Sequence, residues 1–297
     1  MNGILLVDKP AGMTSHDVVD RIRRAAQMRR IGHTGTLDPA ATGLLILCLG
    51  NATRLSEFLT GLDKVYEGTM RFGVVTDSYD LDGKVVEERP VPPLTSGQIQ
   101  EAFDAFSGEI MQLPPMVSAV KVGGERLYEL ARKGETVERE PRKVTVKEFA
   151  LLSYAAPEAA FRVRCTRGTY ARTLCYDVGE RLGCGATLAS LRRTGVGKHT
   201  IAQAKPVDAF QSPGDVAAAL LPANDALDLP AVCVRNASRG TVTSGGALER
   251  KDLRNEFPVD KGWVQVKAEN GELLALGEVH SSFGVLHVQP KRVLGAR

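Results

Sequence analysis

Residues 32–49 read Gly32-His33-Thr34-Gly35-Thr36-Leu37-Asp38-Pro39-Ala40-Ala41-Thr42-Gly43 and then Leu44-Leu45-Ile46-Leu47-Cys48-Leu49. The second part is an apolar run of strand length, which predicts a strand buried within a sheet. The first part is a loop in which Pro39 biases Asp38 away from helical geometry and the glycines permit close packing of the backbone. We therefore expect a carboxylate, Asp38, on a loop that the following strand anchors.

Two interpretations of Asp38 remain open at this stage. Asp38 is a candidate for the chemistry, but Asp-Pro is also an ordinary turn sequence. The spacing alone favours a capping or turn aspartate. A catalytic role therefore needs support from other residues.

The composition indicates a globular protein. The 297 residues are 43% hydrophobic and 25% charged, which argues against wholesale disorder. This length suits one large and one small domain. The apolar run at residues 4–7 is too short for a signal peptide, and no segment reaches the uncharged span of about 18 residues that a membrane helix needs. We expect a cytoplasmic protein that does not contact a membrane.

No familiar metal or nucleotide site is indicated. The five cysteines include no Cys-x-x-Cys pair, and the five histidines include no His-Glu-x-x-His arrangement. The turn at residues 78–83 resembles a calcium loop, but Arg89 stands where a glutamate is needed, so a polar turn is predicted. We predict chemistry without a metal or cofactor. The net charge of +3 is too small to indicate nucleic-acid binding, so any such surface must be a local patch.

The hydrophobic pattern predicts an α+β fold. Alternation over residues 64–73 places Tyr66 on the apolar face of a half-buried antiparallel strand. Ser15 is expected to cap a helix with one apolar face, and Thr95 with Gln98 forms a capping box before another. Further predicted elements are a strand at 161–166, a helix from 170 to 182 and a short strand at 188–191.

Two segments differ in character from the rest. Residues 114–145 are predicted to form an inserted arm with a short helix at 127–133. The cations of the arm are offset by glutamates, so a solvated helix face and a phosphate-binding surface explain its charge equally well. Beyond a Pro- and Ala-rich boundary, short glycine-separated strands are predicted at 232–234, 262–266, 273–279 and 285–288, which indicates a small β-rich domain.

Several blocks of sequence, in matching order, resemble the TruB family of bacterial tRNA pseudouridine synthases. The blocks are Leu5-Leu6-Val7-Asp8-Lys9-Pro10-Ala11-Gly12-Met13-Thr14-Ser15, residues 32–43, Lys64-Val65-Tyr66, Ser118-Ala119-Val120-Lys121 through Leu127-Tyr128, Gly168-Thr169-Tyr170-Ala171-Arg172 and Leu191-Arg192-Arg193. The tail resembles a PUA RNA-binding domain only through its glycines and strand rhythm.

The resemblance implies a fold and an activity. The fold would be a pseudouridine synthase domain at residues 1–228, with a mixed, mainly antiparallel sheet and an inserted RNA-binding arm, followed by a small PUA-like β-barrel at 229–297. The activity would be isomerisation of the uridine at position 55 in the TΨC loop of tRNA. The substrate partner would be the TΨC stem-loop, and no obligate protein partner is implied.

The resemblance also assigns roles to residues. It implies that Asp38 is the nucleophile, attacking either the sugar carbon or the uracil ring, and that Arg172 pairs with it and orients it. A cation at a helix start is unfavourable without a partner, which supports this pairing. The alternative for Arg172 is a surface cation. Lys9 and Pro10 are expected to support the pocket and need not touch the substrate.

The target base must leave its stack to reach a buried carboxylate, so the pocket needs a ring to receive it. Tyr66 resembles the family's stacking tyrosine, although a core aromatic is the simpler interpretation. Tyr170 resembles a substrate contact, or else it braces the helix start. His33 resembles the histidine that fills the space of the flipped nucleotide, or else it is a turn residue. Leu191 resembles the family's leucine in the pocket wall. For this residue the functional interpretation and a core role nearly coincide.

Two other functions remain open. One is an RNA-binding or tRNA-folding module in which uridine chemistry is incidental or lost. The presence of Asp38, Tyr66 and Arg172 disfavours the loss of chemistry. The other is a related synthase that modifies a different RNA, and it differs from the leading interpretation only in its substrate.

Overall fold

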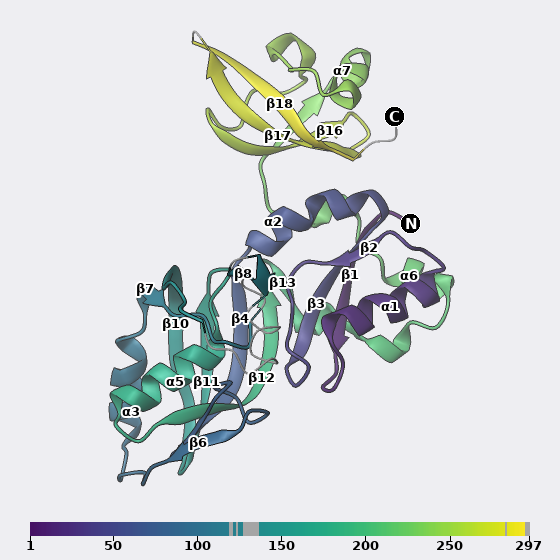
Figure 1. Cartoon of the computed structure of the whole chain (residues 1–297). Coiled ribbons are helices and arrows are strands. Elements are labelled where there is room, and N and C mark those ends of the chain that lie inside the picture. Colours follow the sequence, from purple (N-terminus) through teal and green to yellow (C-terminus); the bar gives the residue numbers. More distant parts are fainter. Residues whose placement is uncertain (119–120, 123, 127–136, 283, 295–297) are drawn as a thin grey trace.

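The computed structural model describes residues 1–118, 121–122, 124–126, 137–282 and 284–294. It contains one large mixed sheet flanked by helices and a smaller sheet formed by the tail (Figure 1). Among the described residues, no helix has the length and apolar character needed to cross a membrane.

The large sheet is mixed and mainly antiparallel, as predicted. Its strand order is β14-β1-β3-β12-β4-β11-β10-β7, with β2 paired to β3 and β13 paired to β12. Among the described strand pairings of this sheet, only β1–β14 and β3–β12 are parallel. The strands are β1 (Gly3–Lys9), β2 (Ile31–His33), β3 (Thr42–Leu49), β4 (Lys64–Phe72), β7 (Gly108–Gln112), β10 (Arg142–Ala155), β11 (Glu158–Cys165), β12 (Ala186–Val196), β13 (His199–Thr200) and β14 (Lys205–Pro206).

Helices cover both halves of this sheet. In Figure 1, α3 and α5 lie beside the half that contains β4, β10 and β11, and α1 and α6 lie beside β1 and β3. The helices are α1 (Ser15–Ala26), α2 (Ser56–Gly61), α3 (Ser96–Asp104), α5 (Ala171–Arg181), α6 (Pro213–Ala219) and α7 (Arg239–Ser244). Short hairpins are formed by β5 (Val74–Thr76) with β6 (Val85–Glu88), and by β8 (Lys121–Val122) with β9 (Glu125–Arg126).

The strand β3 is the buried centre of its half of the sheet. Each residue from 44 to 49 has 0% exposure, which confirms the buried strand predicted from the apolar run. Gly43 begins this run at φ +103°, and a Cβ atom there would lie 2.3 Å from the carbonyl oxygen of Arg193 on β12. Glycine is therefore required where β12 approaches the end of the Asp38 loop.

The start of α1 differs from the prediction. The helix is capped by Thr14 rather than Ser15, because Asp17 lies three residues after Thr14 and the two form a reciprocal capping box. Ser15 is the first residue of the helix, and its hydroxyl is buried. The predicted capping box of Thr95 and Gln98 is confirmed at the start of α3.

The tail forms the predicted small β-rich unit. Its strands are β15 (Ala231–Val234), β16 (Gly262–Ala268), β17 (Leu273–Ser282) and β18 (Val285–Val293), in the order β15-β16-β17-β18. Within the described residues, β15 and β18 are the two ends of this sheet and do not pair. Closure into a PUA-like barrel therefore stays a prediction.

The tail packs against the large sheet through a shared apolar core. Leu273, Leu276 and Leu294 of the tail lie in one cluster with Leu55 and Leu59. Beside this cluster, the rings of Phe58 and Trp263 meet edge to face at 4.6 Å. These contacts fix the tail to the surface formed by η1 (Gly50–Leu55) and α2.

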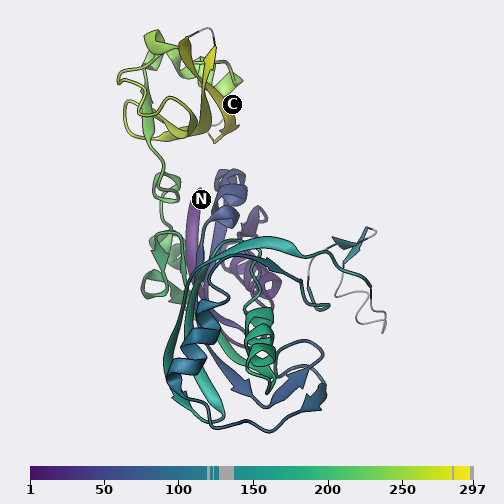
Figure 2. The same ribbon diagram turned by 90° about the vertical axis from the view of Figure 1, so that its left-hand side faces the viewer.

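The predicted arm is described only in part. Figure 2 shows the β8–β9 hairpin projecting from the side of the large sheet, well away from the tail. The predicted helix at 127–133 and the motif residues Ala119, Val120, Leu127 and Tyr128 lie outside the described residues. The division at residues 228 and 229 also stays a prediction.

Candidate active site

One cavity contains most of the predicted site residues. It has a volume of about 280 Å³ and lies between the loop that joins β2 to β3, the strands β4 and β12, and the start of α5. Asp38, Tyr66, Tyr170, Arg172 and Leu191 all line it, together with Lys64, Arg167, Ser118 and Arg193. His33 is not among the lining residues. The fold thus gathers residues that lie far apart in the sequence.

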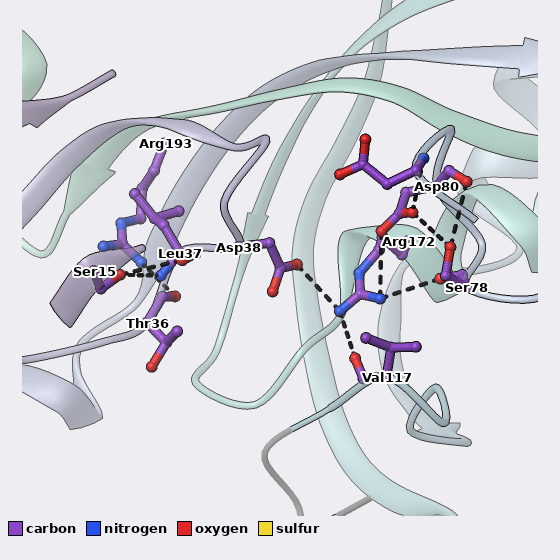
Figure 3. A network of polar contacts seen from close by, with 10 residues as sticks. Ser15, Thr36, Leu37, Asp38, Ser78, Asp80, Val117, Arg172 and Arg193 are labelled. Atoms are coloured by element: carbon purple, nitrogen blue, oxygen red, sulfur yellow. Dashed lines mark hydrogen bonds and ion pairs between the residues drawn. The ribbon is translucent and has the colours of Figure 1, made fainter. Parts of the chain in front are cut away.

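Asp38 and Arg172 form an ion pair in this cavity. Arg172 Nη2 lies 3.1 Å from Asp38 Oδ2 (Figure 3). The Arg172 side chain is only 4% exposed and lies in the first turn of α5. It therefore has the partner that its position at a helix start requires, and a surface cation is excluded.

Three further contacts hold the guanidinium of Arg172. Its Nη2 donates to the carbonyl oxygen of Val117 at 2.8 Å and its Nη1 donates to that of Ser78 at 3.1 Å. Nη1 also lies 3.5 Å from Asp80 Oδ2 (Figure 3). Because both terminal nitrogens of the guanidinium have partners, the arginine presents a fixed positive charge to Asp38.

The carboxylate of Asp38 is less buried than predicted. Its side chain is 50% exposed, because it projects from a loop into a cavity that opens to the surface. The carboxylate is therefore accessible from outside while one of its oxygens contacts Arg172. A turn aspartate would satisfy its own backbone, whereas Asp38 is directed at a buried cation on another element.

The residues on either side of Asp38 are tied to the core. Ser15 Oγ accepts a hydrogen bond from the Leu37 N–H at 2.8 Å and lies 3.2 Å from the Leu37 carbonyl oxygen. The Lys9 ammonium donates to the Pro39 carbonyl oxygen at 3.0 Å. Arg193, 2% exposed, donates to the carbonyl oxygen of Gly35 at 3.0 Å. The loop is therefore held at several points.

Lys9 is a fully buried cation that supports this loop. Its Nζ also donates to the carbonyl oxygens of Pro10 and Met13, at 2.9 and 2.6 Å. Burial lowers the pKa of Lys9 to about 8, and the charge of Asp38 opposes this shift. Lys9 does not line the main cavity, which agrees with a supporting role.

We predict that Lys9→Met destabilises the fold more than it changes RNA recognition. Methionine fills the space but removes the ammonium donor from the carbonyl oxygens of Pro10, Met13 and Pro39, of which Pro39 keeps the Gly12 N–H. We expect a loss of about 2–4 kcal/mol in the free energy of unfolding. Urea denaturation measures this loss. The control is Lys261→Met, at an exposed position of the tail. Equal unfolding midpoints for both variants would contradict the supporting role.

Tyr66 and Leu191 combine a core role with a cavity role. Both pack against the apolar cluster under α3 and α5, and both line the cavity. Burial raises the pKa of the Tyr66 phenol, which keeps it neutral. The two interpretations of Tyr66 are therefore compatible, since one part of the ring is packed and another part faces the cavity.

Tyr170 is positioned by a residue that the sequence did not identify. The Gln112 amide accepts a hydrogen bond from the Tyr170 N–H at 2.8 Å and donates to the Tyr170 carbonyl oxygen at 3.1 Å. Gln112 is 2% exposed at the end of β7. This double contact fixes the backbone at the start of α5, and the Tyr170 side chain lines the cavity.

His33 lies at the start of the loop and is not among the residues that line the cavity. It ends β2, is half-buried, and its Nδ1 accepts a hydrogen bond from the Gly35 N–H at 3.4 Å. Burial, together with the positive charges of Arg193 and His16, lowers the pKa of His33 and favours the neutral ring. Its contact with RNA stays a prediction.

Asp80 is the main site residue that the sequence did not identify. The segment around it forms the predicted polar turn, in which Asp80 Oδ1 accepts a hydrogen bond from the Ser78 hydroxyl at 2.5 Å. The same turn supplies a second carboxylate to Arg172. Nothing in the local sequence indicates this contact. Within the described part of the chain, no group of three or more His, Cys, Asp or Glu residues is arranged to hold a metal ion.

Comparisons with known proteins show the family to which the chain belongs. Residues 23–171 match the family model described as TruB family pseudouridylate synthase (N terminal domain), and residues 172–227 match the tRNA pseudouridylate synthase B C-terminal domain. Proteins named tRNA pseudouridine synthase B are similar over most of the chain. The one from Opitutus terrae is 56% identical over 71% of this chain and 88% of its own length, and the one from Burkholderia pseudomallei is 44% identical over 100% and 98%.

Solved structures share the fold. A Cbf5–Nop10–Gar1 complex contains a chain that is 27% identical, with a TM-score of 0.77, covering 99% of this chain and 85% of that one. An H/ACA RNP bound to a substrate RNA containing 2′-deoxyuridine matches with 25% identity and a TM-score of 0.76, covering 99% of this chain and 86% of that one. Both matches extend over the large sheet and the tail.

Proposed function

The chain belongs to the TruB family of pseudouridylate synthases, and we propose that it isomerises the uridine at position 55, in the TΨC loop of tRNA, to pseudouridine. The observation that carries this proposal is the ion pair between the accessible carboxylate of Asp38 and the buried guanidinium of Arg172. It lies in a cavity of about 280 Å³ that opens to the surface. A module that only binds RNA has no need of an accessible carboxylate paired with a buried arginine.

The chemistry requires a nucleophile but no external reagent. The bond between the sugar carbon C1′ and uracil N1 breaks, the uracil turns over, and a bond forms between C1′ and C5. The proton on C5 is lost and N1 gains one, so the reaction involves no net oxidation, reduction or hydrolysis. We therefore propose that the enzyme uses neither a metal nor a cofactor.

Asp38 would supply the nucleophilic oxygen, at the sugar carbon or at the uracil ring. Arg172 would hold that oxygen in position before the substrate arrives, because its other contacts leave it no freedom to follow the carboxylate. This arrangement limits the reorganisation needed at the moment of attack.

The remaining residues would receive the flipped uridine. Tyr66 offers a neutral ring for stacking and Leu191 an apolar wall, while Tyr170 closes the side near α5. His33, at the start of the loop, would occupy the space in the RNA that the flipped nucleotide has vacated. Burying the base between such groups offsets the free energy of unstacking it.

We further propose the division of the chain into a synthase domain at residues 1–228 and a PUA-like RNA-binding domain at 229–297. The shared apolar core holds the tail in a fixed place, so both parts would contact one tRNA together. A tRNA substrate would place the reaction in the cytoplasm. The TΨC stem-loop is the proposed partner.

We expect the purified protein, after treatment with EDTA, to convert the target uridine in a TΨC stem-loop RNA to pseudouridine. Nucleoside analysis of the digested RNA by mass spectrometry, after cyanoethylation of pseudouridine, measures the conversion. A stem-loop with cytidine at the target position is the control RNA. If the uridine stem-loop remains unconverted at saturating enzyme, this function is wrong.

A further inference from the structure

Ser118 carries a buried hydroxyl that has no hydrogen-bond partner. The residue is 5% exposed, and its Oγ contacts no donor or acceptor among the described residues. Burying a hydroxyl without a partner is unfavourable, so native proteins rarely leave one unpaired. The position of Ser118 therefore needs an explanation beyond the packing of the free protein.

Ser118 belongs to the wall of the Asp38 cavity. Ser118 lines the same cavity as Asp38 and Arg172, and the preceding residue, Val117, accepts the 2.8 Å hydrogen bond from Arg172. The other hydroxyl-bearing residues that line the cavity are Thr36, Thr60, Tyr66, Thr166, Thr169 and Tyr170. The hydroxyl groups of Thr60, Thr166 and Thr169 each have a backbone partner. Among these hydroxyl groups, that of Ser118 is the one that is both buried and without a partner in the described part of the chain. Its Oγ is covered in the free protein, so a ligand in the cavity meets it once the side chain or the group that covers it moves.

The backbone around Ser118 is held in place. The Ser118 N–H donates to the Met116 carbonyl oxygen at 3.0 Å, and Pro114 and Pro115 are buried. Arg139 Nη1 donates to the Pro114 carbonyl oxygen at 2.9 Å. Together with the contact from Arg172 to Val117, these bonds fix the segment that presents the hydroxyl.

We propose that Ser118 Oγ hydrogen-bonds the uracil of the nucleotide that enters the cavity, which makes Ser118 a substrate-binding residue. This inference rests on the proposed function. The polar edge of uracil offers carbonyl oxygens and N–H groups. A serine hydroxyl both donates and accepts, and it rotates freely. It can therefore bond one of these groups before the base turns over and another afterwards.

The first test is Ser118→Ala under single-turnover conditions with the TΨC stem-loop. We expect conversion to slow about tenfold, the effect of one lost hydrogen bond. We also expect the melting temperature of the free protein to stay the same or rise, because the substitution removes an unpaired buried hydroxyl. Ser153→Ala, which removes an exposed hydroxyl on β10, is the matched control and should change neither quantity.

The second test distinguishes a contact to the base from a contact to the RNA backbone. In the Asp38→Asn background, which allows binding without turnover, Ser118→Ala should weaken binding of the uridine stem-loop about tenfold. It should leave the affinity for a stem-loop with an abasic target position unchanged. An equal loss for both RNAs would place the contact outside the base and overturn the inference.

Two further outcomes also overturn it. Unchanged conversion and unchanged affinity would mean that the hydroxyl does not contact the substrate. A lower melting temperature with an equal loss for both RNAs would assign Ser118 a structural role. The parent protein is assayed with the same stem-loop throughout. An inactive parent would overturn the proposed function, whereas an active parent with a fully active Ser118→Ala variant would overturn only this inference.

Discussion

Replacing Asp38 by asparagine lowers the single-turnover rate of pseudouridine formation by roughly 10⁴-fold or more, the scale seen when a catalytic nucleophile is removed. Asparagine keeps the size of the side chain and can still accept a hydrogen bond from Arg172. It lacks the negative charge that makes the carboxylate a nucleophile. Because Asp38 projects into an open cavity and supports no buried element, we expect the fold and the affinity for RNA to be preserved.

The control for this prediction is Asp82→Asn. Asp82 is another loop carboxylate near the site, and it has no ion pair with Arg172 among the described residues. We expect it to retain nearly full activity. Rapid-quench measurement of pseudouridine, with a filter-binding assay of the stem-loop, compares the two variants. If Asp38→Asn and the parent converted the RNA at similar rates, the assignment of Asp38 as the nucleophile would be wrong.

Arg172→Lys gives the second large effect. We expect a rate about 10²–10³-fold lower, the loss seen when one preorganised donor in an active site is removed. Lysine keeps the positive charge, but an ammonium cannot reach Asp38, Asp80 and two backbone carbonyl oxygens in the planar geometry of guanidinium. The carboxylate would therefore lose its fixed orientation while the net charge of the cavity stays the same.

Arg167→Lys is the matched control for Arg172→Lys. Arg167 lines the same cavity but is exposed. We expect less than a threefold change in rate for Arg167→Lys. Arg167 is exposed, so any contribution it makes depends on its positive charge, which lysine keeps, and not on the planar geometry of the guanidinium. Comparable losses for the two substitutions would show that charge alone matters, which contradicts the positioning role of Arg172.

The parts of the fold that depend on local patterns could be predicted from the sequence. The apolar run at 44–49 indicates a buried strand and Thr95 with Gln98 indicates a capped helix, because burial periodicity and capping act within a few residues. The cap of α1 shows the limit of such reasoning. Thr14 and Ser15 both suit the cap position, and only the reciprocal bond with Asp17 selects Thr14.

The site could be predicted only where a family resemblance supplied the pairing. Asp38 and Arg172 lie 134 residues apart, and no periodicity relates them. Asp80 and Gln112 were not identified because their roles arise from contacts across the fold: Asp80 meets Arg172, and Gln112 brackets the peptide of Tyr170. A polar residue in a turn or at a strand end gives no local signal of such a contact.

The most direct test of the central claim is pseudouridine mapping at single-nucleotide resolution in a full-length tRNA transcript. One sample is treated with the parent protein and a parallel sample with Asp38→Asn at equal RNA occupancy. We expect pseudouridine at position 55 in the first sample and unmodified uridine there in the second. Pseudouridine at position 55 in both samples, or in neither, would contradict the claim that the Asp38 carboxylate isomerises this uridine.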